Sequence, residues 1–143
     1  MSMNCKLIVL VKNLSKISYI ISALLTLGSM LVASNVSATV YTSQNNGQYD
    51  NCNIWTNGCA PNEIQAGDTV IVNHNVEASS SMEISGVLII NVSGELSHVN
   101  DVDLYQSGRL EVYGTLSIQA EFNMRGTMYN SGLSIIQNFR NRG

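Results

Sequence analysis

The sequence predicts an all-β protein built as a short single-stranded parallel β-helix, a solenoid of about four coils. Two observations lead to this prediction. Apolar residues occupy the even-numbered positions from Met82 to Met128 with few exceptions, and every second glycine recurs after 18 to 22 residues. The alternation excludes a helix, because a period of 3.6 would scramble it within two turns. An antiparallel β-sandwich also alternates and is the alternative.

The glycines mark positions where the chain bends without losing this alternation. Several are followed two residues later by a large apolar residue, as in Gly108–Leu110 and Gly114–Leu116. Asn-Gly and Asp-Gly, the common hairpin tips, do not occur after Gly58. We therefore expect residues 107–118 to form two short strands of one coil, with even side chains inside and odd side chains in water.

The chain divides into four predicted segments. Residues 1–38 have the features of a secretory signal peptide, because three lysines precede an apolar run that ends in small residues at Ala38. A transmembrane anchor over 17–33 is the alternative. After the signal peptide we expect an N-terminal strand and cap loop at 39–63, the β-helix at 64–136, and a C-terminal tail at 137–143.

The charge of the exported part argues against some partners. Cleavage after Ala38 removes all three lysines and leaves four arginines against ten carboxylates, a net charge of −6. Phosphate binding requires clustered cations, so we expect no nucleic-acid partner. The mature protein, with one modest domain, is expected to be secreted, at the cell surface or in the extracellular space, with no membrane contact after cleavage.

Two cysteines remain after cleavage. Cys52 and Cys59 are predicted to form a disulfide that closes a small loop in the cap, as an even pair does in an exported chain. A metal pair is the alternative, but two thiols need two further ligands, and the histidines lie in other segments. We expect neither a metal nor a cofactor.

A resemblance to a known group rests on the residues from 54 to 97. The stretch "IWTNGCAPNEIQAGDTVIVNHNV", followed by "MEISGVLIINVSGELS", resembles the start of secreted right-handed parallel β-helix proteins of the pectate-lyase-like type. In that group a Trp and a Pro precede a first strand that begins Gly-Asp-Thr-Val. Here Trp55 and Pro61 precede the same four residues, which begin at Gly67. The resemblance covers roughly 54–134 and implies a right-handed solenoid. The group includes pectin-active enzymes, adhesins and matrix proteins, so no single activity is implied.

The sequence predicts a protein that is not an enzyme. Asp101 and Asp103 share an outward face where two carboxylates could hold calcium, but Arg109 and Arg125 are the only candidates for the cation or base that a lyase needs. Glutamates at odd positions are typical of any soluble β surface.

Three other polar features also have structural interpretations. His74 and His98 fall on even positions and are expected to be buried and hydrogen-bonded. The segment Asn91-Val92-Ser93 matches a glycosylation sequon, but Val92 is expected in the core. Neither feature predicts a catalytic site.

The two ends of the solenoid differ in sequence and suggest a function. The start has a loop-rich cap with Trp55 over the first coil, whereas the last residues stay apolar at Leu133, Ile135, Ile136 and Phe139. We expect the N-terminal strand, with Val40 and Tyr41, to be donated to the open end of another copy. The leading hypothesis is a secreted structural subunit that forms a homopolymer head to tail, as an extracellular filament or matrix.

A carbohydrate-binding or adhesive module is the alternative function. Tyr105, Tyr113 and Tyr129 are odd residues near successive corners, where their rings could stack on sugars as one strip. The expected partner in that case is a polysaccharide.

Overall fold

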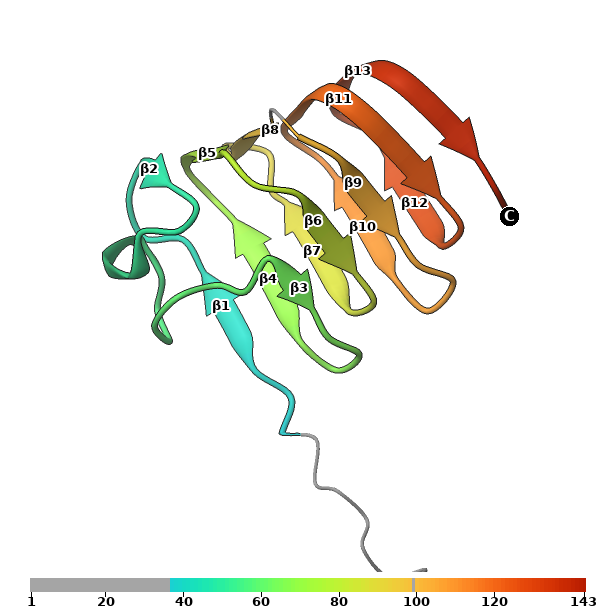
Figure 1. The fold of residues 1–143 in the computed structure, drawn as a ribbon. Coiled ribbons are helices and arrows are strands. Elements are labelled where there is room, and N and C mark those ends of the chain that lie inside the picture. Colours follow the sequence, from blue (N-terminus) through green and yellow to red (C-terminus); the bar gives the residue numbers. More distant parts are fainter. Residues whose placement is uncertain (1–36, 99) are drawn as a thin grey trace, which may run out of the picture. The chain divides into compact units, whose positions relative to one another are not determined.

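The computed structural model describes residues 37–143, apart from Val99 and the side chain of His98. The predicted signal peptide lies outside the described residues except for Ser37 and Ala38. Every pairing between named strands is parallel, and the strands wind into a β-solenoid of about four turns (Figure 1). The predicted β-helix is therefore confirmed, and the antiparallel sandwich is excluded.

The strands lie on three faces around one core. Face A stacks five strands in chain order, namely β1 (Val40–Thr42), β4 (Thr69–Val72), β7 (Val87–Ile90), β10 (Arg109–Val112) and β12 (Thr127–Asn130). Face B stacks β2 (Gly47–Gln48), β5 (Asn75–Ala78), β8 (Glu95–His98) and the first parts of β11 (Thr115–Met124) and β13 (Leu133–Asn141). Face C stacks β3 (Glu63–Ile64), β6 (Met82–Ile84), β9 (Val102–Leu104) and the second parts of β11 and β13.

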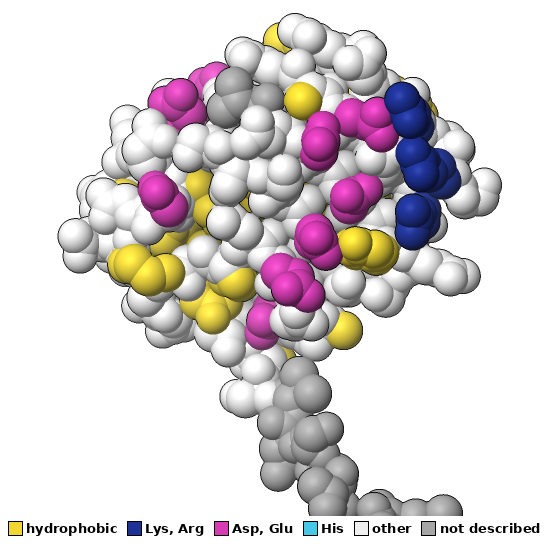
Figure 2. Space-filling view, in the orientation of Figure 1, with side chains coloured by type: hydrophobic (Ala, Val, Ile, Leu, Met, Phe, Trp, Pro, Cys, Tyr) yellow, Lys and Arg dark blue, Asp and Glu magenta, His cyan; other side chains and the backbone are white. Residues whose placement is uncertain are grey.

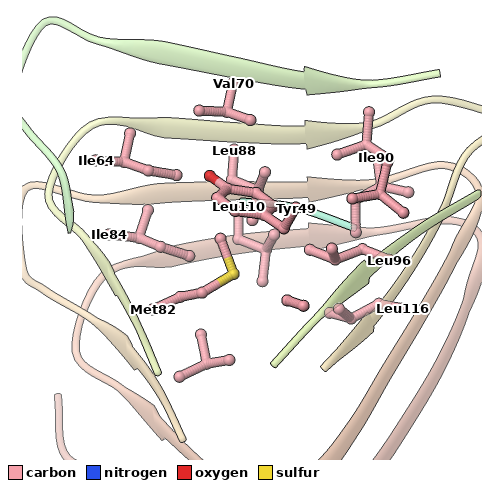
Figure 3. Close-up of a cluster of buried hydrophobic side chains, with 14 of the residues drawn as sticks. Tyr49, Ile64, Val70, Met82, Ile84, Leu88, Ile90, Leu96, Leu110 and Leu116 are labelled. Carbon is pink, nitrogen blue, oxygen red and sulfur yellow. The ribbon is translucent and has the colours of Figure 1, made fainter. Parts of the chain in front are cut away.

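The even-numbered side chains fill the core, as the alternation predicts. The register places Val70, Leu88 and Leu110 directly above one another on face A, and all three are fully buried. Figure 3 shows these side chains in one cluster with Ile64 and Ile84 of face C and with Leu96 and Leu116 of face B. Each apolar side chain buried in this way contributes about 1.5–3 kcal/mol to folding.

The coils alternate between 18 and 22 residues because their corners differ in length. The longer coil, from Val87 to Gly108, contains β-turns at 91–94 and 105–108, where Gly94 and Gly108 donate to the carbonyls of Asn91 and Tyr105, both at 2.8 Å. These turns each add two residues that point away from the core, so the alternation is kept. Val92 lies in the first turn and is 83% exposed, so its expected core position is wrong.

Two of the three columns of corners contain stacked glycines. One column contains Gly86, Gly108 and Gly126, and the other contains Gly94, Gly114 and Gly132. A Cβ at Gly114 would overlap with the carbonyl oxygens of Asn91 and Gly94 in the coil before it. Glycine is required there because the corner backbone lies directly on the preceding corner.

The last coil differs from the predicted C-terminal tail. β13 continues through the corner between faces B and C to Asn141, so 137–143 is mostly strand. Ile136 and Asn138 of β13 pair with Ile118 and Glu121 of β11. The corner between these two pairs is therefore one residue shorter in β13 than in β11. The inward side therefore changes from even to odd positions.

Substitution of Gly114 tests the stacked corners. We expect Gly114→Ala to lower the free energy of unfolding by about 1–3 kcal/mol, because the added methyl group must displace two carbonyl oxygens. The control is Ser131→Ala, at an exposed position beside Gly132, the next glycine of the same column. Its free energy of unfolding is expected to stay within about 0.5 kcal/mol of that of the parent protein. Urea unfolding of the two variants makes the comparison, and equal stabilities would contradict the close contact.

Candidate functional site

The N-terminal end of the solenoid is closed by a cap. The Cys52–Cys59 disulfide is present, as predicted, next to the short 3₁₀ helix η1 (Cys52–Ile54). Tyr49 and Trp55 are both buried and pack edge to face, with ring centroids 5.1 Å apart. The Trp55 indole donates to the Tyr49 carbonyl at 2.9 Å, and the Tyr49 hydroxyl donates to the Pro61 carbonyl at 2.9 Å. Trp55 thus covers the start of the core.

The cap also covers the free edge of β1. The amide and the carbonyl of Thr42, which point away from β4, bond to Thr56 at 3.1 and 3.0 Å. The Val40 carbonyl accepts from the Asn57 side chain at 2.6 Å. The two residues expected in a donated strand, Val40 and Tyr41, therefore lie in β1, paired with β4 of their own chain. Donation of this strand to another copy would require β1 to separate from β4 and from the cap residues Thr56 and Asn57.

The C-terminal end has no such cover among the described residues. β12 pairs only with β10, and β13 pairs only with β11. The amides of Thr127, Leu133 and Arg142 donate to the preceding coil, so in each strand the intervening residues present their N–H and C=O groups to the free side. These intervening residues are Met128, Asn130, Ser134, Ile136, Phe139 and Asn141. A free edge of this length is a template for another strand.

Apolar side chains surround this free edge. Tyr129, Leu133, Ile135 and Phe139 are each between 50% and 56% exposed, whereas Met128 and Ile136 are half-buried against the core. Phe139 packs on Phe122 with ring centroids 5.6 Å apart. The structure therefore brings the four predicted end residues, Leu133, Ile135, Ile136 and Phe139, into one strand at the end of the solenoid.

Two buried polar atoms have no hydrogen-bond partner among the described residues, the Asn123 Oδ1 in β11 and the Ser134 Oγ in β13. The Ser134 hydroxyl is directed toward the core, since Ser134 lies in register with buried Leu116, and its Oγ has no hydrogen bond among the described residues. An unsatisfied buried hydroxyl costs about 1–3 kcal/mol. The last two coils therefore each carry one unsatisfied buried polar atom, and of the two only Ser134 lies in a strand with a free edge.

The charges are also distributed unevenly. Figure 2 shows positively charged side chains gathered along one edge, with carboxylates over the rest of the visible face, and three of the four arginines lie at or beyond residue 125. Arg140 and Arg142 both pair with Glu121, at 3.0 and 3.6 Å. Exposed pairs of this kind add little stability, so their main effect is on what approaches this end.

Two of the three predicted tyrosines lie together, Tyr129 on face A and Tyr113 at the corner that follows β10. The rings of Tyr113 and Tyr129 have centroids 5.6 Å apart, and Tyr113 donates to Glu111 at 2.8 Å. Glu111 is only 8% exposed and also pairs with Arg109 at 2.6 Å. The hydrogen bond to Glu111 raises the pKa of Tyr113. A shallow hollow of about 580 Å³ lies beside them, lined also by Gln106, Ser107 and Thr127.

Tyr105 lies in a different hollow. Its hydroxyl donates to Glu83 at 3.0 Å, which raises its pKa, and the Arg125 guanidinium lies 5.9 Å from its ring centroid. The Gln106–Ser107 turn lines both hollows. The separation of Tyr105 from the Tyr113–Tyr129 pair could not be predicted from the sequence. The turn at 105–108 contains two additional residues, and the alternation of apolar and polar residues does not reveal them.

The other polar candidates have structural roles. The Asp101 carboxylate accepts from the Glu121 amide at 3.1 Å. Nδ1 of His74 lies 2.9 Å from the Ser43 carbonyl, so His74 is hydrogen-bonded as expected, but it is half-buried and not buried. The His98 side chain lies outside the described residues. Within 37–143, apart from the two positions noted above, no three His, Cys, Asp or Glu side chains are grouped to hold a metal.

The buried phenol of Tyr49 makes the cap sensitive to alkali. Burial raises the pKa of Tyr49 above its ordinary value of 10.0, so the folded state keeps the neutral phenol after the unfolded chain has begun to ionise. This contribution to stability is complete below pH 10 and is lost as the pH rises toward the folded pKa. We expect Tyr49→Phe to lower the free energy of unfolding by about 1 kcal/mol at pH 7, because the hydrogen bond to the Pro61 carbonyl is lost. Between pH 10 and higher pH, the variant should lose less additional stability than the parent protein does.

Urea unfolding at pH 7 and pH 11 measures both effects. Tyr129→Phe, which alters an exposed ring, is the control and should follow the parent at both values. An equal alkaline loss in Tyr49→Phe and the parent would contradict this role of Tyr49.

Comparisons add no assignment to these surfaces. Within the part of the chain that the structure describes, no helix is long and apolar enough to cross a membrane. No family model, curated protein or solved structure matches this chain.

Proposed function

We propose that the mature chain is a secreted, non-catalytic structural subunit that assembles with further copies by β-strand addition at its C-terminal end. The observation that carries this proposal is the free edge of β12 and β13, which together offer strands of four and nine residues. Natural proteins usually shorten, charge or cover such an edge. Here the N-terminal edge is covered by the cap, and the C-terminal edge is left long and apolar.

Export is part of the same proposal. The Cys52–Cys59 disulfide supports it, because such bonds persist in oxidising compartments. We also propose kinship with secreted right-handed parallel β-helix proteins, on the resemblance at Trp55, Pro61 and Gly67. The product of assembly would be an extracellular homo-oligomer, filament or matrix.

The predicted head-to-tail order has one point in its favour and one against it. Arginines lie at the C-terminal end, and exposed carboxylates such as Asp50 and Glu63 lie in the cap and first coil, so the two ends attract each other. The cap, however, already bonds to the outer groups of Thr42 and Val40. Continuous strand pairing in this order requires residues 54–57 to move aside.

A proline at the free edge tests strand addition. We expect Ser134→Pro to weaken self-association by about 2 kcal/mol, roughly thirtyfold in Kd, because it removes an N–H that points away from β11. Ser134→Ala keeps that N–H and is the matched control, and it should still associate. Sedimentation velocity over a range of concentrations makes the measurement.

The parent protein also provides a direct test. A parent that stays monomeric at the highest concentration reached would refute assembly. Electron microscopy distinguishes filaments from closed oligomers.

A second candidate function is binding of a polysaccharide on face A. The tilted Tyr113–Tyr129 pair beside Arg109 favours it, since exposed rings next to a held guanidinium suit the apolar face and the hydroxyls of a sugar. Arg109 is oriented by Glu111, so its free N–H groups are directed outward.

Substitution of Tyr129 tests this second function. We expect Tyr129→Ala to weaken glycan binding by about tenfold, because it removes one ring of the pair. Tyr105→Ala, in the other hollow, should leave that binding unchanged. A glycan array screened with the parent identifies the ligand, and calorimetry then compares the variants. The absence of any bound glycan, or an equal loss in both variants, would refute the assignment to face A.

A further inference from the structure

We infer that the copy that covers the C-terminal end is inverted, so that two subunits meet tail to tail in a closed twofold dimer through β12 and β13. This inference rests on the proposed function and specifies the partner and its register. It requires no movement of the cap, because both contributing edges are unpaired within the part of the chain that the structure describes.

The three-sided end has the symmetry that this contact needs. A twofold axis perpendicular to the solenoid can enter at the corner between faces B and C and leave through the middle of face A. Such an axis places β12 antiparallel to its own counterpart. It also places the first part of β13 on the second part of the other copy's β13. Closed twofold contacts of this kind are the commonest among homo-oligomers.

The side-chain directions select one register. Directly opposite residues in an antiparallel pair point to the same side, so inward residues must face inward residues. Five inward residues of the last coil meet one another in this register, namely Met128, Ser134, Ile136, Phe139 and Asn141, each in register with a core-facing residue of the preceding coil. The sixth inward residue, Asn130, lies above Val112 and falls opposite Gly126 of the second copy, before its β12 begins. Met128 then faces its own counterpart, Ile136 faces Phe139, and Ser134 faces Asn141 of the second copy.

This register satisfies the backbone groups that the single chain leaves free at five of the six residues of the edge, all but Asn130. The same five residues present their backbone N–H and C=O groups to the free side, so the opposed pairs exchange about ten hydrogen bonds, the number of a typical interface. The Ser134 hydroxyl, which has no partner among the described residues of its own chain, faces the Asn141 side-chain amide. Ile136 and Phe139 extend the apolar core across the contact.

The charges are compatible with the same arrangement. The twofold axis brings Arg140 and Arg142 onto face B of the second copy, beside Ile135 and Leu133. Among the described side chains that point outward on face B, the only charged ones are Glu77 and Glu95. The two arginine groups therefore lie on opposite sides of the axis instead of meeting.

Disulfide trapping tests the register in the full-length protein under mild oxidation. We expect Met128→Cys to form a covalent dimer, because the two positions meet on the axis within the Cα range of a disulfide. Asn130→Cys, on the same strand but about four residues from its counterpart, should not. A mixture of Ser134→Cys and Asn141→Cys should cross-link, although neither variant cross-links alone.

The outcomes separate this inference from assembly in general. Covalent dimers in both designs, with none in Asn130→Cys or the parent, would support the inverted dimer. Larger oligomers or a dimer without these cross-links would overturn it and leave strand addition in place. A parent that is monomeric at all concentrations would overturn both.

Discussion

The backbone hydrogen bonds between coils impose the constraint on which the rest of the structure depends. They run along the solenoid axis, so each strand must lie directly above the strand of the preceding coil, as Leu88 lies above Val70. Corners must then stack as closely as strands. The two glycine columns meet this requirement, because no side chain fits between the corner backbone and the carbonyl oxygens beneath it.

Much of the fold could be predicted because this constraint leaves a regular trace in the sequence. Inward positions recur every second residue, and corner glycines such as Gly94 and Gly114 recur at the coil length. The position of Val92 could not be predicted, because a turn that adds two residues keeps the alternation while pointing its apolar residue to solvent. The inward direction of Phe139 was equally hidden, since one residue fewer at a corner without glycine shifts the alternation.

The candidate surfaces could be predicted less fully. The apolar residues of the C-terminal end were legible as a run without a polar cap, and Trp55 with the cysteine pair marked the covered end. The sequence could not show that Thr56 and Asn57 bond to the outer edge of β1, because those contacts depend on how the cap folds back. Nor could it show that Tyr113 and Tyr129 meet while Tyr105 lies beside Arg125.

The direction of the hydrogen bonds has a mechanical consequence. A tensile force along the solenoid axis loads the bonds between one pair of coils in series with the next, so the least supported coil separates first. In the single chain that coil contains β12 and β13, each held by one neighbour. The cap resists longer, because the Cys52–Cys59 bond fixes its loop and Trp55 anchors it to the core. Under load the subunit would extend stepwise from its C-terminus, dissipating work one coil at a time.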